Sequence, residues 1–208
     1  MKTIDTGVLV HSDGHPVSYE VRNGWSPDTC AECDRVWGAY TVEFFHFIAH
    51  HGFSGDELAK VLLSMQTEDS HWDWSTKASL LNSEGYEWFY LVADGKPQGV
   101  CVIYHPKESV LSKANIFYVD FLAVAPWNRD CSIRKRQLKG VGTALLRAAL
   151  RYSVSHLKLS AGFSLLSLPQ AAMYYKKLKM VNLKEHDDGL LAYFELPADV
   201  ATELMGVA

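Results

Sequence analysis

The sequence predicts a mixed α/β fold, with strands first, then two helices, a strand meander, and alternating helices and strands. Three observations lead to this prediction: helical spacing of apolar residues in the first third, strand-like patterning from residue 87 onward, and a glycine-rich turn between an apolar strand and a helix. The length of 208 residues fits one domain. Within 1–208 we expect an N-terminal strand and early helices over 1–85, a core over 86–196 and a tail over 197–208.

The bulk composition is that of a globular protein, with 48% hydrophobic and 21% charged residues. The formal net charge of −4 argues against a nucleic-acid partner. No apolar run reaches the 18 or so residues of a membrane-spanning helix, so no membrane partner is expected. The first residues lack an apolar signal core, which predicts a cytoplasmic location.

The first third reads as strands followed by helices. Residues 7–23 predict one strand or a pair of strands, because polar and apolar residues alternate there. Apolar residues at helical spacing predict helices over 29–50 and 56–66, with Gly52 ending the first of them. A further short helix is expected over 76–81.

From residue 87 the pattern changes to that of strands. Residues 88–93 and 98–104 predict a hairpin, since Asp94-Gly95 is a turn signal between two apolar runs. The elements expected after it are a strand over 116–124, a helix over 142–156, a buried strand over 161–168, a helix from Pro169 to Leu178, a hairpin of 180–185 with 190–196, and a short terminal helix after Pro197.

The glycine-rich turn spans residues 137–142, with the sequence Gln-Leu-Lys-Gly-Val-Gly. It follows an apolar strand and opens a helix whose first N–H groups have no partner within the helix, an arrangement that binds anions such as a pyrophosphate. The motif alone is short, and a glycine-containing loop before an ordinary amphipathic helix fits it equally well. It lacks the Gly-Lys-Ser/Thr of a Walker loop and the third glycine of a dinucleotide fingerprint.

Two motifs in the same order make the chain resemble the GNAT superfamily of N-acetyltransferases. Val124-Ala125-Pro126 followed by residues 137–142 is similar to the family's strand end and its Gln/Arg-x-x-Gly-x-Gly/Ala turn. About 30 residues later, residues 171–178 are similar to the Ala-x-x-x-Tyr helix that leads into Lys-Leu. The resemblance covers roughly residues 86–196. It implies the GNAT acyltransferase fold: a central mixed, mostly antiparallel sheet flanked by helices, with two strands that splay apart to hold acetyl-CoA.

The sequence departs from the family pattern in two places. Residues 127–136 are an insertion between the proline and the glycine turn, so we expect this loop to be mobile or to face the substrate. Lys179-Met180 stands where the family has Gly-Phe. The cofactor-binding residues that the resemblance implies are Leu122, Ala123, Val124, Gln137, Leu138, Lys139, Gly140, Val141, Gly142 and Thr143.

Acetyl transfer to an amine needs a base for the amine, a donor for the oxyanion and an acid for the thiolate. The resemblance assigns Tyr175 as the acid, in preference to the neighbouring Tyr174, and a backbone N–H near Val124 as the oxyanion donor. The base is Asp120, because a carboxylate in an otherwise apolar strand is costly to bury without a function. Tyr118, Glu87 or a water chain could serve instead.

These residues predict an enzyme that moves an acetyl group from acetyl-CoA to an unidentified amine, on a small molecule or a protein, by direct attack in a ternary complex. In this family the early helices and their loop select the amine, which here corresponds to the segments 50–53 and 72–74, with their aromatic and polar side chains. The favoured interpretation of the two tryptophans in 72–74 is that they cap the core. Alternatives are a non-catalytic acyl-CoA-binding module, a nucleotide-binding protein, and an enzyme using a longer acyl-CoA. A homodimer is compatible with the sequence.

Two other groups of residues have a structural and a functional interpretation. Cys30 and Cys33 have redox or metal spacing, but no second such pair follows, so we expect reduced structural cysteines and no metal. The basic residues 134–136 and Lys139 could meet cofactor phosphates or form a solvated loop, and the same holds for 176–177.

Overall fold

The computed structural model describes residues 1–206. The strands of that part form one nine-stranded sheet in the order β6-β1-β2-β3-β4-β5-β7-β9-β8. Neighbouring strands are antiparallel except β5 and β7. The strands are β1 (Lys2–His11), β2 (Pro16–Asn23), β3 (Tyr86–Ala93), β4 (Lys96–Glu108), β5 (Asn115–Val124), β6 (Leu138–Lys139), β7 (Phe163–Ser167), β8 (Val181–Asn182) and β9 (Ala192–Leu196).

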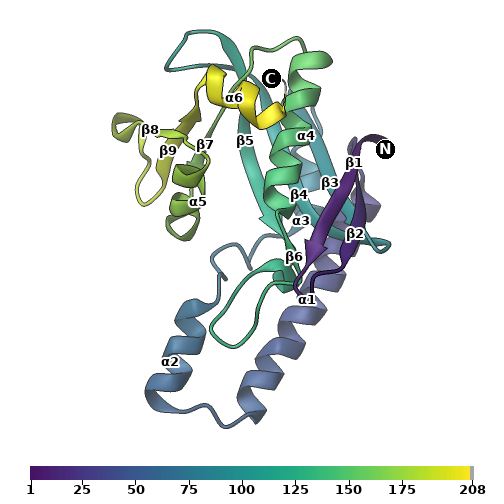
Figure 1. Ribbon diagram of the computed structural model, residues 1–208, viewed down its shortest axis with the longest axis vertical. Coiled ribbons are helices and arrows are strands. Elements are labelled where there is room, and N and C mark those ends of the chain that lie inside the picture. Colours follow the sequence, from purple (N-terminus) through teal and green to yellow (C-terminus); the bar gives the residue numbers. More distant parts are fainter. Residues whose placement is uncertain (207–208) are drawn as a thin grey trace.

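Helices cover both faces of this sheet (Figure 1). Those longer than one turn are α1 (Pro27–His50), α2 (Gly55–Ser64), α3 (Trp74–Leu80), α4 (Val141–Ser155), α5 (Ala172–Lys177) and α6 (Ala198–Met205). Single 3₁₀ turns are η1 (Pro126–Asn128), η2 (Pro169–Ala171) and η3 (Lys184–His186).

Two apolar cores lie on the two faces. The larger core packs α4, α5 and α6 against the sheet and includes Leu145, Phe117 and Phe194, all fully buried. The smaller core packs the first half of α1 and all of α3 against the other face through Trp37, Trp74 and Trp88. The second half of α1 projects from the body together with α2 (Figure 1).

The helix ends follow local chemistry. Ser26 caps α1 by accepting a hydrogen bond from the Thr29 N–H at 3.3 Å, and Pro27 occupies the first turn, where its missing N–H costs nothing. Asp73 caps α3 in the same way through the Thr76 N–H. Among the described residues, none of the helices is both long and apolar enough to cross a bilayer.

The fold class predicted from the sequence is confirmed, and most elements lie within a few residues of their expected positions. Three details differ. The helix expected from Pro169 starts with the turn η2. The last hairpin is short, because its first strand is only Val181–Asn182 and the turn η3 follows from Lys184. The strand β6 was not predicted, since two residues carry no period of their own.

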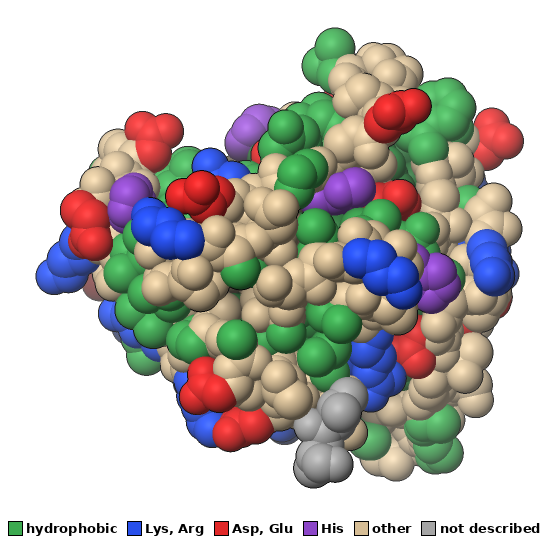
Figure 2. All heavy atoms as spheres, turned by 90° about the horizontal axis from the view of Figure 1, so that it is seen from above, with side chains coloured by type: hydrophobic (Ala, Val, Ile, Leu, Met, Phe, Trp, Pro, Cys, Tyr) green, Lys and Arg blue, Asp and Glu red, His purple; other side chains and the backbone are tan. Residues whose placement is uncertain are grey.

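Surface charge is mixed on the face of the molecule that Figure 2 shows. Acidic and basic side chains alternate there with polar and apolar ones. This pattern accompanies a formal net charge of −4 and lacks the single-sign field that steers polyanions.

Candidate active site

The candidate site begins where β5 and β7 separate. The two parallel strands pair at Phe117, Tyr118 and Val119 of β5, opposite Phe163 to Leu165 of β7. Beyond that point β7 continues alongside β9 only, while β5 stays paired with β4 as far as Val124 (Figure 1). A wedge therefore opens between the strands, as expected, and the edge of β5 beyond Val119 is unpaired on the β7 side.

A β-bulge marks the apex of this wedge. On β4, Val102 faces Phe121 and the next residue, Ile103, faces Val119, so Asp120 is the extra residue of β5. A bulge reverses which side chains face each side of the sheet. Accordingly Val119 and Leu122 both belong to the α4 side, and Phe121 to the opposite side. Asp120 is thereby presented at the point where the strands part.

The open edge of β5 offers backbone groups at alternate residues. The Ala125 N–H donates to the Gln98 carbonyl of β4 at 2.9 Å, and successive residues of a strand point to opposite edges. The N–H groups of Leu122 and Val124 therefore face the wedge. The Val124 carbonyl is already used, because it accepts hydrogen bonds from Arg129 Nε at 3.1 Å and Arg129 Nη2 at 2.8 Å.

The glycine turn lies at the wide end of the wedge. Gly140 caps α4 with φ +95°, a conformation that glycine adopts without strain. The next residues, Val141 to Thr143, begin α4, so their N–H groups have no partner within the helix. A Cβ on Gly142 would lie 3.7 Å from the Tyr174 hydroxyl and 3.8 Å from the Val124 side chain, which places Gly142 directly across from β5.

The first residues of the turn already use backbone groups in hydrogen bonds and strand pairing within the protein. The Gln137 N–H donates to the Trp127 carbonyl at 2.8 Å, and the Leu138 N–H donates to Asn128 Oδ1 at 3.0 Å. Lys139 pairs with Val10 of β1. These three residues fix the course of the turn, so any contact that Gln137 or Leu138 makes with a ligand must use other atoms.

The two neighbouring tyrosines of α5 occupy different environments. The Tyr174 hydroxyl lies 3.1 Å from Thr143 Oγ1, next to the glycine turn, and burial raises its pKa to about 12. Tyr175 is 7% exposed and packs on Phe194, with ring centroids 5.9 Å apart. Burial also raises the pKa of Tyr175. Both hydroxyls therefore keep their protons at neutral pH, and Tyr174 is a site neighbour that the sequence did not single out.

The surroundings of Asp120 at the apex make its carboxylate more basic than an exposed one. Burial raises the pKa of Asp120, while the positive charge of Lys77 acts in the opposite direction. Lys77 itself comes from α3, and its Nζ lies 3.6 Å from the centre of the Phe121 ring. Burial lowers the pKa of Lys77, whereas Asp120 raises it. Burial raises the pKa of the alternative base, Tyr118, to about 12, which makes it a weaker candidate at neutral pH.

A cavity of about 460 Å³ lies on the α1 side of β5. Its walls come from α1, from the segment 65–74 and from the loop 126–134, and Ala123 of β5 forms part of its floor. The segment 72–74 is thus at the cavity, as expected for a selecting element, whereas 50–53 is not part of the lining. Its aromatic lining residues are Trp37, Tyr40, Phe44, Trp72 and Trp74.

The inserted loop 127–136 is held by specific contacts and forms one wall of this cavity. Arg129 pairs with Asp69 and donates to the Gln66 carbonyl. The Arg134 guanidinium lies 4.1 Å from the centre of the Phe44 ring, and Arg136 pairs with Asp130. Two of the three basic residues at positions 134–136, which were considered for phosphate binding, therefore have partners inside the protein.

The cysteine pair is part of the small core. Cys30 and Cys33 are fully buried, and Cys30 Sγ lies 3.3 Å from the Tyr90 hydroxyl. Burial raises the pKa of the Cys30 thiol to about 11. This disfavours the thiolate that redox chemistry or metal binding requires, in line with the expectation of structural cysteines.

Comparison with solved structures identifies the fold. No family model and no curated protein matches the sequence. Among solved structures, RimJ from Mycobacterium smegmatis, determined in complex with CoA-disulfide, aligns with 99% of this chain and 97% of its own, at a TM-score of 0.54 and 16% identity. FdhC, a nucleotide-linked sugar GNAT, aligns over 89% of each chain at a TM-score of 0.54 and 11% identity. The chain has the GNAT fold.

Arg129 yields a first prediction, on stability. The side chains of Arg129 and Asp69 are only 15% and 10% exposed, so Arg129→Ala leaves a buried carboxylate unpaired and should lower the free energy of unfolding by about 3–5 kcal/mol. Arg136→Ala in the same loop breaks an exposed pair, with side chains 45% and 46% exposed, and should cost no more than about 1 kcal/mol. Urea unfolding of both variants measures this, and equal losses would contradict the assignment of Arg129 as the anchor.

Proposed function

We propose that this protein is an acetyl-CoA-dependent N-acetyltransferase that acts on a primary amine by direct attack in a ternary complex. The observation that carries the proposal is the unpaired edge of β5 beyond Val119, which lies beside the free N–H groups at the start of α4. One extended ligand with an anionic end can use both at once. Acetyl-CoA has this shape, with an amide-containing pantetheine arm joined to a diphosphate.

The cofactor assignment follows from the chemistry of the two surfaces. The pantetheine amides bond to the Leu122 and Val124 backbone as an added strand would. The diphosphate lies at Val141 to Thr143, where the helix dipole and the free N–H groups favour negative charge. Gly142 leaves room for this approach, since its missing side chain faces β5.

The reaction is assigned to the apex of the wedge. Asp120 accepts the amine proton, which frees the lone pair for attack on the thioester carbonyl. The N–H of Val124 or Leu122 stabilises the oxyanion, because these donors are fixed in the sheet before the reaction begins. Tyr175 then donates a proton to the departing thiolate; burial keeps its hydroxyl protonated until then.

The acceptor amine is assigned to the cavity on the α1 side. Its aromatic walls suit a partly apolar molecule and can hold an ammonium group against a ring face. Ala123 lines the cavity while Leu122 and Val124 face α4, so the two substrates approach β5 from opposite faces. Phe121, next to Asp120 in the sequence, packs edge-on against Trp72 of the cavity wall, with ring centroids 5.0 Å apart.

The decisive experiment is a calorimetric titration with acetyl-CoA, followed by a panel of primary amines assayed for thiol release. Binding together with amine-dependent release supports the proposal. Binding without turnover of any amine favours a non-catalytic acyl-CoA module. Thermal stabilisation by ATP without stabilisation by CoA would replace the proposal with a nucleotide-binding function.

Asp120 gives a second prediction, on pH. Its raised pKa means that the folded protein binds this proton more tightly than the unfolded chain does. Stability linked to Asp120 is therefore present at low pH and is lost as pH rises through the window between the unfolded value and the raised folded value. Asp120→Asn should be more stable than the parent at pH 7, and equally stable below pH 4 or so.

The same substitution should lower turnover by about 10²–10⁴-fold. Parent turnover should fall with decreasing pH through the raised pKa of Asp120, and the Asn variant should lose this limb of the profile. Thermal unfolding and steady-state rates across pH measure the two effects. An Asn variant with parental turnover would exclude Asp120 as the base.

A further inference from the structure

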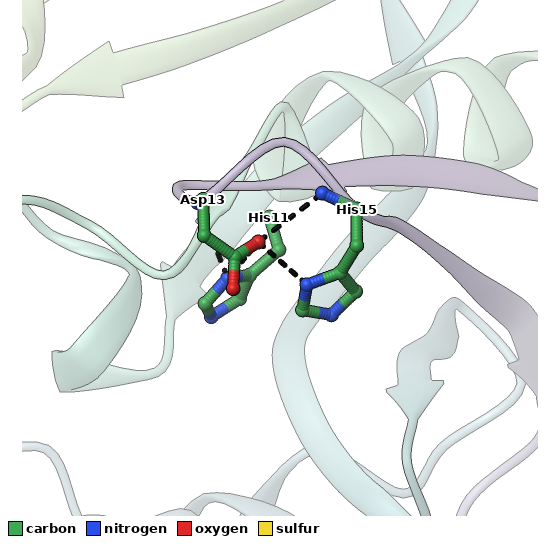
Figure 3. A group of neighbouring side chains, drawn as sticks. All are labelled: His11, Asp13 and His15. Atoms are coloured by element: carbon green, nitrogen blue, oxygen red, sulfur yellow. Dashed lines mark hydrogen bonds and ion pairs between the residues drawn. The ribbon is translucent and has the colours of Figure 1, made fainter.

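The turn between β1 and β2, which contacts the start of the glycine turn, gathers three metal-ligating side chains. His11, Asp13 and His15 occupy alternate positions, and their rings and carboxylate converge on one point (Figure 3). His11 Nδ1 lies 3.0 Å from Asp13 Oδ1, and His15 Nδ1 lies 2.5 Å from the same oxygen. The three ligand atoms all lie within 4.8 Å of one another.

The backbone of this turn holds the three residues in place. The His11 N–H donates to the His15 carbonyl at 2.9 Å, and the Gly14 N–H donates to the His11 carbonyl at 2.9 Å. Gly14 has φ +97°, which suits glycine, and Pro16 fixes the chain directly after the turn. The His15 N–H also donates to Asp13 Oδ1 at 3.1 Å and so orients the carboxylate. The ligand set is therefore preorganised rather than assembled from flexible ends.

The geometry points to a binding site for a divalent transition-metal ion, with Zn²⁺ as the reference ion. Ligand distances of about 2.0–2.2 Å around Zn²⁺ separate neighbouring ligand atoms by about 3.3 Å in a tetrahedral site. The Nδ1 and Oδ1 atoms reach this separation through shifts of less than about 1 Å. Two imidazoles and one carboxylate favour zinc, nickel or copper over magnesium and calcium, which prefer oxygen ligands. The exposed turn leaves a fourth position for water.

An ion at this site would also fix the start of the glycine turn. The Ser12 N–H, inside the same turn, donates to the Gln137 carbonyl at 2.8 Å, and His11 pairs with Leu138. The expectation of a metal-free chain was based on the cysteines. The His-x-Asp-x-His spacing did not enter that expectation, since it indicates a metal site only once the turn brings the three side chains together. This inference is independent of the proposed acetyltransferase activity.

The test is a calorimetric titration of tag-free, chelator-treated protein with Zn²⁺, with Co²⁺ absorption as the spectroscopic readout. We expect one ion per chain, and a loss of affinity of at least about tenfold in His11→Gln and in His15→Gln. The matched control is the double variant His46→Gln/His50→Gln, which removes a second exposed histidine pair whose rings lie 6.4 Å apart on α1. It should bind as the parent does.

Three results would overturn the site. They are no binding by the parent, unchanged affinity in His15→Gln, and loss of binding in the α1 control. Circular dichroism establishes that each variant is folded. The substitutions lie in an exposed turn, so we expect the fold to be retained. Hydrogen exchange with and without Zn²⁺ should show slower exchange over residues 11–15 and 137–140 in the parent only. Protection confined to 11–15 would overturn the link to the glycine turn.

Discussion

Gly142→Glu should reduce acetyl-CoA affinity at least about 100-fold, which corresponds to about 2.7 kcal/mol. The substitution places a carboxylate at the start of α4, between the free N–H groups and the open edge of β5. The introduced carboxylate would compete with the diphosphate for the same N–H donors. The two negative groups would also repel each other. Calorimetric titration of the parent and the variant measures the effect.

The matched control is Gly142→Ala. A Cβ at this position would make its nearest contacts at 3.7 and 3.8 Å, which is ordinary van der Waals distance, and Gly142 does not adopt a positive φ. The alanine variant should therefore fold normally and keep affinity within about tenfold of the parent. A folded Gly142→Glu variant with parental affinity would remove the helix start as the diphosphate site.

Tyr175→Phe should lower turnover by about 10²–10⁴-fold while acetyl-CoA affinity stays within a few-fold of the parent. The physical reason is that only the hydroxyl is removed: the ring still packs against Phe194, and the leaving thiolate loses its proton donor. The deficit should shrink when the leaving thiol of the acyl donor is more acidic, because such a group needs less protonation.

Tyr174→Phe is the matched comparison, because its hydroxyl lies at the glycine turn, 3.1 Å from Thr143 Oγ1. If Tyr175 is the acid, Tyr174→Phe should change affinity or KM by no more than about tenfold and leave turnover almost intact. The reverse pattern, with turnover lost only in Tyr174→Phe, would transfer the acid role to Tyr174. Steady-state rates and binding constants for both variants distinguish these outcomes.

The parts of the fold that follow from local pattern were predictable. The spacing of apolar residues along α1 and α4 gives a helix directly, and the turn at Asp94-Gly95 gives the β3–β4 hairpin. The glycine turn could be found from the sequence because its backbone requires glycine. Gly140 has φ +95°, a conformation that other residues rarely adopt. Each of these signals lies within about 20 residues of chain.

Features that depend on distant partners could not be predicted. The strand β6 forms only because β1, more than 120 residues earlier in the numbering, supplies an edge for Lys139 and Leu138. The bulge at Asp120 is set by the register with β4 and leaves the apolar character of β5 unchanged. Arg129 lies in a loop that departs from the family pattern, and its partner Asp69 is 60 residues away.

The parted strands have a consequence for the ligand-free protein. Sheet edges with unpaired N–H and C=O groups attract other extended chains, and proteins usually shield them. Here Leu122 and Val124 present such groups between two well-packed layers. A bound pantetheine arm would satisfy those groups as an extra strand beside β5. Saturating coenzyme should therefore suppress self-association during heating, and the empty form should be the species that aggregates.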